Sequence, residues 1–124
     1  MIVLDTNVII RYLVKDDEIR AEKAKLLLEQ GKELVIPDVV LPEIEYVLRK
    51  LSKATHRELI KTFKFLKSLR NIHLTKEARD AIAIFDKSKL DMADCIVAAY
   101  SMKGSLASFD KDLLGLGGIN PFWK

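Results

Sequence analysis

Four acidic side chains stand where the chain passes from one element to the next. Asp5 and Asp110 follow short apolar runs, and Glu43 and Asp94 fall in the expected first turns of helices. Carboxylates that meet in one cleft destabilise the fold unless a cation lies between them. The two histidines and the single cysteine lack zinc-ligand spacing. Hard oxygen ligands then favour Mg²⁺ or Mn²⁺, and the expected chemistry is phosphodiester hydrolysis by an activated water.

Each carboxylate also has an ordinary structural role to weigh. Asp5 could cap the first helix, but Thr6 and Asn7 are equally able caps, and either would leave Asp5 free. Glu43 could be a solvated first-turn residue favoured by the helix dipole. Asp94 stands among residues expected to be buried, where an unpaired carboxylate is costly. This cost favours a cation as the partner of Asp94.

Four other positions have both a structural and a site interpretation. Asp91 is better explained as the N-cap of the helix that contains Asp94, although the two residues could share a helical face. Asp110 could equally be a turn residue. Ser108 could bond a carboxylate or a metal-bound water at the site, or be an ordinary strand-end serine. Arg11 is either a phosphate ligand or a surface residue.

The elements that must position these residues alternate between strands and helices. Short apolar runs predict strands at 2–4, 33–37, 71–74 and 105–109, with room for a short fifth around Ile119. Amphipathic stretches between them predict helices. This order indicates an α/β fold with a parallel sheet of four to five strands in one domain, residues 1–124. Because right-handed crossovers bring like strand ends to one edge, we expect the four acids to meet there.

Local signals set the expected ends of several helices. Gly31 is expected to end the helix 18–30 in a left-handed conformation. Asp38 is expected to cap a helix that begins at Val39. Thr55 and Glu58 form a capping-box pattern at the start of the next helix.

Composition limits the class of protein. A chain of 124 residues, 49% of them hydrophobic, can bury a core, and its net charge of +3 permits nucleic-acid binding without requiring it. There is no apolar run long enough for a membrane span, and the N-terminus is a poor signal peptide. With Cys95 as the only cysteine, we expect a cytoplasmic protein without membrane association.

Four segments in order resemble the PIN-domain family, and in particular the VapC-type toxins of prokaryotic type II toxin–antitoxin systems. The segments are VLDTNVIIRYL (3–13), VLPEIEYVL (40–48), DMADCIVAA (91–99) and SFDK (108–111). The family's glutamate corresponds to Glu43 rather than Glu45. Ser108 stands where threonine is usual, and this departure keeps the hydroxyl.

The resemblance implies a three-layer α/β/α sandwich with Mg²⁺- or Mn²⁺-dependent ribonuclease activity. The metal-site residues would be Asp5, Glu43, Asp94 and Asp110, with Asp91 as an accessory acid. RNA would be the substrate. The resemblance also implies a homodimer and a small antitoxin protein that blocks the cleft.

Two alternatives come from other classes of function. One is a phosphatase or phosphotransfer domain with Asp5 as the nucleophile. Such phosphatases commonly carry a second Asp two residues later, where this chain has Asn7, and this counts against them. The other is a non-catalytic module that binds RNA or protein. The four intact acids count against this alternative.

Overall fold

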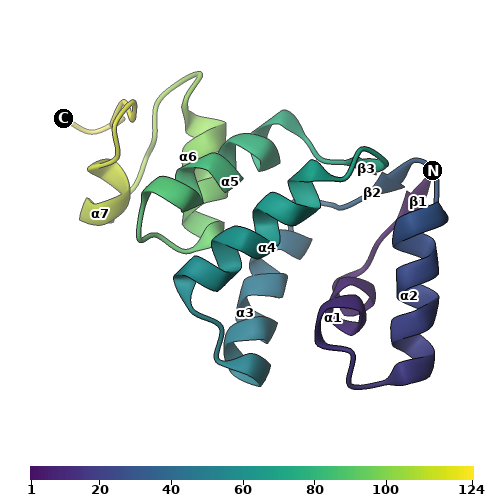
Figure 1. Ribbon diagram of the computed structural model, residues 1–124. Helices are drawn as coiled ribbons and strands as arrows, with labels where there is room; N and C mark the ends of the chain where they lie inside the picture. Colours follow the sequence, from purple (N-terminus) through teal and green to yellow (C-terminus); the bar gives the residue numbers. More distant parts are fainter. The chain divides into compact units, whose positions relative to one another are not determined.

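Three short parallel strands organise the first part of the chain, and pairs of helices connect them (Figure 1). The computed structural model describes residues 1–124. The chain divides into two compact units, Met1–Thr75 and Lys76–Lys124, and each is described here by itself. The assignment of residues 1–124 to a single domain stays a prediction.

The first unit shows the alternation of strands and helices that the sequence predicts. Its elements are β1 (Ile2–Val3), α1 (Thr6–Val14), α2 (Glu18–Gln30), β2 (Leu34–Val35), α3 (Val40–Ser52), α4 (His56–Ser68) and β3 (Ile72–His73). The strand order is β1-β2-β3, with Ile2 beside Leu34 and Leu34 beside Ile72. Helix α1 packs against α2 and α3.

The core of the first unit is apolar and comes from every one of its helices and from the sheet. Strand β2 contributes Leu34, which is fully buried, and each helix contributes the residues on one of its sides. The largest fully buried side chains in this unit are Leu4, Ile9, Leu34, Ile36, Leu41, Ile44, Leu59, Phe63, Leu66 and Ile72. Burial of this apolar surface is the main force that holds the helices against the short strands.

Asn71 links three elements of the first unit. Its side-chain amide donates to the carbonyl oxygens of Leu28 and Gly31 at 2.9 and 2.8 Å, at the end of α2. Its main-chain carbonyl accepts the N–H of Leu34 in β2 at 2.8 Å. One side chain therefore satisfies carbonyl groups that a helix end leaves without partners.

Several helix ends differ from the sequence prediction. The capping box is confirmed, because Thr55 and Glu58 each accept the other's backbone N–H. The prediction of a left-handed conformation for Gly31 is wrong, since its backbone is extended at φ −67°. Glycine is needed there for space, because a Cβ atom would lie 2.5 Å from the carbonyl oxygen of Leu27. The capping role predicted for Asp38 is also wrong, because α3 begins at Val40 and its N-cap is Val39, which makes no side-chain cap bond. The carboxylate of Asp38 accepts a hydrogen bond from the Thr75 hydroxyl.

The second unit is helical. Its elements are α5 (Lys76–Lys87), α6 (Met92–Ser101) and the short α7 (Lys111–Leu114). Helix α5 packs against α6. Ala98, Leu106 and Leu113 form a buried cluster, and Leu90 and Ile119 pack against it.

The predicted count of four to five strands is wrong, because the sheet has three. In place of strands at 105–109 and around Ile119 there is a single parallel bridge between Leu106 and Pro121. Leu106 is the only buried residue of 105–109. A segment with one inward-facing apolar residue has little to gain from a longer ladder. None of the helices combines the length and apolarity that crossing a membrane requires.

Candidate functional site

The end of β1 and the start of α1 position Asp5. The N–H of buried Leu4 donates to Val35 at 2.8 Å, which fixes the end of the strand. Asp5 is the N-cap residue of α1, and its Oδ1 accepts the N–H of Thr6 at 2.8 Å. The expectation that Thr6 or Asn7 caps this helix is therefore wrong, because the helix already begins at Thr6. Asp5 keeps its second carboxylate oxygen for another partner.

The first turn of α3 positions Glu43, and the same helix separates it from Glu45. Glu43 is exposed, whereas Glu45 is 6% exposed and its Oε2 accepts from Nε and Nη2 of Arg49 at 3.0 and 2.8 Å. The two glutamates thus lie in different environments two residues apart. Glu45 is engaged in a structural ion pair, and Glu43 is presented to solvent.

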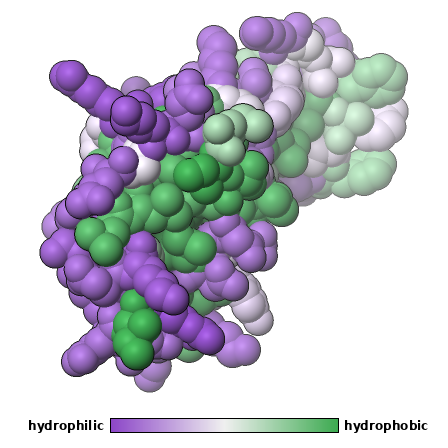
Figure 2. All heavy atoms as spheres, turned by 90° about the vertical axis from the view of Figure 1, so that its right-hand side faces the viewer, coloured by the Kyte–Doolittle hydropathy of each residue, from purple (hydrophilic) through white to green (hydrophobic).

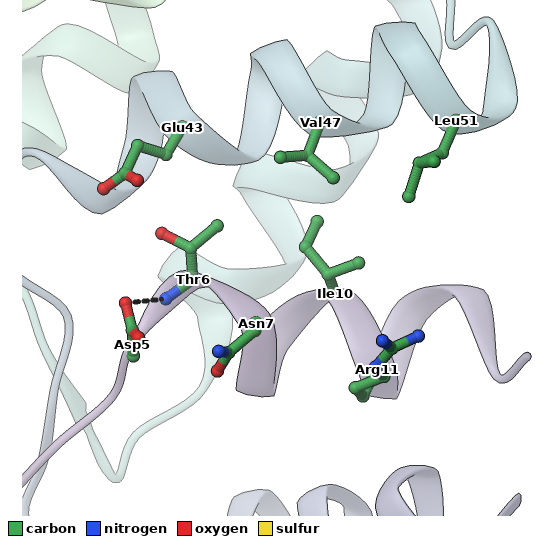
Figure 3. A pocket seen from close by; sticks show the side chains of 8 residues that line it. All are labelled: Asp5, Thr6, Asn7, Ile10, Arg11, Glu43, Val47 and Leu51. Atoms are coloured by element: carbon green, nitrogen blue, oxygen red, sulfur yellow. Dashed lines mark hydrogen bonds between the residues drawn. The ribbon is translucent and has the colours of Figure 1, made fainter. Parts of the chain in front are cut away.

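Asp5 and Glu43 line one pocket of about 340 Å³ between α1 and α3 (Figure 3). Their carboxylates lie at one end of it, together with the hydroxyl of Thr6. The full lining is Asp5, Thr6, Asn7, Ile10, Arg11, Glu43, Val47 and Leu51. The pocket therefore has a polar end with oxygen ligands and an apolar end.

The apolar wall is the part of the site that sequence analysis missed. It consists of Ile10 from α1 and of Val47 and Leu51 from α3. The signal was present, because Glu43, Val47 and Leu51 recur at every fourth residue, a spacing that aligns side chains along one helix face.

The hydroxyl of Thr6 is buried and has no hydrogen-bond partner. A buried hydroxyl without a partner costs about 1–3 kcal/mol, so its retention calls for an explanation. Figure 3 shows it at the start of α1, pointing toward α3, the helix that carries Glu43. Three oxygen-bearing side chains thus face one end of the pocket.

Arg11 lies at the far side of the pocket and is bonded to Asp16. Its Nη1 donates to Asp16 Oδ1 at 2.7 Å. This hydrogen bond raises the pKa of Arg11 and lowers the pKa of Asp16. Arg11 also lines a second pocket with Asn7 and Arg20. Arg11 therefore lines both pockets, and Arg20 lines only the second.

The second unit holds the remaining predicted residues. Asp91 caps α6 by accepting the N–H of Asp94 at 2.9 Å, which confirms its structural role, and Asp94 is partly buried in the first turn. Asp110 caps α7 by accepting two backbone N–H groups at 2.9 and 3.1 Å through Oδ1. Ser108 accepts the N–H of Asp110 at 3.0 Å.

The structure brings together Asp5 and Glu43, with Thr6 and Asn7 beside them. The convergence of Asp94 and Asp110 on this pair stays a prediction, because these two aspartates belong to the other unit. Within either unit, no three His, Cys, Asp or Glu side chains gather closely enough to hold a metal ion. The donor set of Asp5, Thr6 and Glu43 nonetheless fits a hard cation, because all its atoms are oxygens.

The comparisons with known proteins identify a family. The family model described as PIN domain matches residues 2–118 of this chain. The match covers most of both compact units and includes all the candidate site residues. Neither the curated proteins nor the solved structures include a match to the chain. A match over nearly the whole sequence shows that the chain belongs to the PIN-domain family.

Proposed function

We propose that this protein is a Mg²⁺- or Mn²⁺-dependent endoribonuclease that hydrolyses RNA phosphodiester bonds, and that it is the toxin of a VapBC-type toxin–antitoxin pair. PIN domains are generally metal-dependent nucleases, which fits this proposal. One observation carries it furthest. Asp5 and Glu43 come from distant parts of the sequence and line the same pocket, with the buried hydroxyl of Thr6 beside them.

The candidate residues have two kinds of proposed role, metal binding and support of the metal ligands. Asp5, Asp94, Asp110 and Glu43 would hold one or two divalent ions. A bound ion would supply charge stabilisation at the phosphate and a more acidic water. The supporting residues would be Thr6, Asn7, Asp91 and Ser108.

The chain's own geometry explains how Asp5 could serve such a site. Because Oδ1 accepts the N–H of Thr6, the carboxylate is held in one orientation at the end of β1. A ligand fixed in this way loses little conformational entropy when it binds a cation. Arg11 and Arg20 lie beside the pocket and would neutralise phosphate groups of the RNA backbone.

The partner proposals are a homodimer and an antitoxin. Figure 2 shows an apolar band on the face of the molecule turned to the viewer. The exposed large apolar residues near the start of the first unit are Met1, Ile2, Val3, Ile19 and Leu26. Helical spacing in the sequence predicts Ile19 on the buried side of α2, and its 73% exposure shows that this prediction is wrong. Exposed apolar surface of this kind is typical of protein-binding faces.

The decisive experiment measures RNA cleavage by the purified protein, freed of any bound partner. Structured and single-stranded RNAs would be incubated with Mg²⁺, with Mn²⁺ and with excess chelator. We expect cleavage only when a metal is present. Cleavage that continues in chelator would exclude the metal-dependent mechanism.

The variant for this experiment is Asp5→Asn rather than Asp5→Ala. Because Asp5 caps α1, alanine would also remove the cap and cost about 0.5–2 kcal/mol of stability. Asparagine keeps the cap and removes the charge, so a loss of cleavage in a folded protein would report on the site. A phosphorylated Asp5 would instead favour the phosphotransfer alternative, and RNA binding without cleavage would favour the binding-module alternative.

A further inference from the structure

Three exposed aromatic side chains cluster beside Asp110 in the second unit. Phe109 and Trp123 are stacked, with ring centroids 4.9 Å apart and planes 9° from parallel. Phe122 meets the Trp123 ring edge-on at 5.4 Å. The three residues are 88, 54 and 61% exposed, for Phe109, Trp123 and Phe122 in that order. We call Phe109, Phe122 and Trp123 the aromatic cluster.

Backbone hydrogen bonds join the two segments that carry this cluster, around Leu106 and around Pro121. Leu106 donates its N–H to Asn120 and accepts the N–H of Phe122, both at 2.8 Å. This parallel pairing sets Leu106 beside Pro121. Beyond this bridge, the ring of Trp123 stacks on the ring of Phe109. The pairing of the two segments thus holds two large rings against each other at the surface.

The aromatic cluster is too small to be a stable protein interface by itself. An aromatic side chain buries about 150–250 Å², so three of them bury at most about 750 Å², and two already cover each other. A stable interface buries about 800 Å² on each partner, with few charges at its centre. Here Asp110, Lys111 and Lys124 immediately flank the rings. The size suits one to three flat rings of a ligand.

The flanking cations suit a polyanion. Lys111 follows Asp110 directly and Lys124 follows Trp123, and both lysines are exposed and form no ion pair. Aromatic faces bordered by cations are the usual platform for unpaired nucleobases, because every base has a face to stack and a phosphate to neutralise.

We propose that the aromatic cluster is a stacking platform for unpaired bases of the RNA, next to Asp110, and that the substrate is single-stranded at this point. This inference rests on the proposed ribonuclease function, because it gives Asp110 a place in the site. The outer face of Phe109 would receive the first base. The rings would act on binding and positioning, while cleavage belongs to the carboxylates.

The chain provides its own probe for this platform. Trp123 is the single tryptophan, so intrinsic tryptophan fluorescence reports only on the aromatic cluster. The full-length protein in excess chelator would be titrated with a single-stranded RNA of roughly eight nucleotides. Two further titrations would use the same RNA annealed to its complement and an abasic strand of equal charge. We expect saturable quenching by the single strand, and little or none by the duplex and the abasic strand.

Variants separate stacking from apolar contact. Phe109→Leu keeps an apolar side chain but removes the ring face, and we expect it to weaken single-strand binding by about 10- to 100-fold. Phe109→Tyr should restore the affinity. Tyr46→Leu is the matched control, because it removes an exposed aromatic ring of α3 that does not line the pocket. Thermal melting would confirm that each variant is folded.

The outcomes decide between this platform and its competitors. Equal quenching by the abasic strand, or unchanged binding by Phe109→Leu, would overturn stacking. Fluorescence that changes with protein concentration alone, with a matching change in sedimentation, would identify a protein interface instead. Cleavage in Mg²⁺ without quenching would leave the ribonuclease standing and remove the platform. Quenching without cleavage in any metal would do the opposite.

Discussion

Replacing Glu43 and Glu45 one at a time should separate catalysis from stability within three residues of α3. Glu43 is exposed and lines the pocket, whereas Glu45 is buried and bonded to Arg49. Glu43→Gln should therefore lower RNA cleavage and leave folding intact. Glu45→Gln should destabilise the protein and leave the cleavage rate of the folded fraction unchanged.

The structure sets the size of both effects. A hydrogen bond to a charged group contributes about 1.5–3 kcal/mol, and Arg49 is partly exposed, so we expect a loss near the lower end, about 2 kcal/mol, for Glu45→Gln. For a domain of this size this lowers Tm by about 6–10 °C. Exposed Glu43 should change stability by less than about 0.5 kcal/mol. Loss of one ligand's charge in the transition state, about 2–3 kcal/mol, corresponds to roughly 100-fold slower cleavage.

Two assays on the same purified variants measure the two effects. Urea denaturation gives the free energy of unfolding, and initial rates of RNA cleavage in Mg²⁺ give the activity per folded molecule. The reasoning would be refuted if Glu45→Gln abolished cleavage while folded and Glu43→Gln did not. A variant with both glutamates replaced should show both losses, added together.

Three further predictions concern the backbone, a buried hydroxyl and pH. Gly31→Ala should cost about 1–3 kcal/mol of unfolding free energy, because the new Cβ meets a backbone carbonyl at 2.5 Å, while Gly104→Ala should change it by less than about 0.5 kcal/mol, since nothing lies within 4 Å. Thr6→Val should stabilise the metal-free protein by about 1 kcal/mol and slow cleavage, because it removes a buried hydroxyl without a partner. The pKa of Glu58 is lowered because its carboxylate accepts the backbone N–H of Thr55. Glu58 therefore contributes stability above its usual pKa, and this contribution is lost as pH falls through the lowered pKa. In denaturation curves recorded at different pH, Glu58→Gln should reduce this loss of unfolding free energy at acid pH, the acid limb.

Each of these has a contradicting result. Equal stability losses for Gly31→Ala and Gly104→Ala would mean that crowding is not the reason for glycine at residue 31. A destabilised Thr6→Val protein would show that the hydroxyl has a partner in solution. An unchanged acid limb for Glu58→Gln would assign the pH dependence to other carboxylates.

The sequence predicted the helices well because their signals are local. The capping box of Thr55 and Glu58 needs only four residues, and the apolar spacing of each helix is complete within it. The strands were harder, since two or three residues carry no full period. The error at 105–109 shows the limit, because apolar composition cannot reveal how many residues will find a pairing partner.

The candidate site was predicted in its residues more fully than in their roles. Spacing and topology indicated that Asp5 and Glu43 share an edge, and the pocket they line agrees with this. The role of Asp5 as a cap was misjudged, because the exact first residue of a helix depends on where the preceding strand ends. The partners of Arg11 and Glu45 were also beyond the sequence, since both depend on rotamers.

Asn71 bears on the order in which the first unit folds. Its amide and carbonyl join the end of α2, β2 and the start of β3, segments that lie on either side of the α3–α4 pair in the chain. None of these bonds can form before that intervening loop of chain is closed, and long closures are slow. The helices are therefore expected to form early and the sheet late. If the sheet forms late, Asn71→Ala should speed unfolding of the full chain in stopped-flow measurements more than it slows refolding.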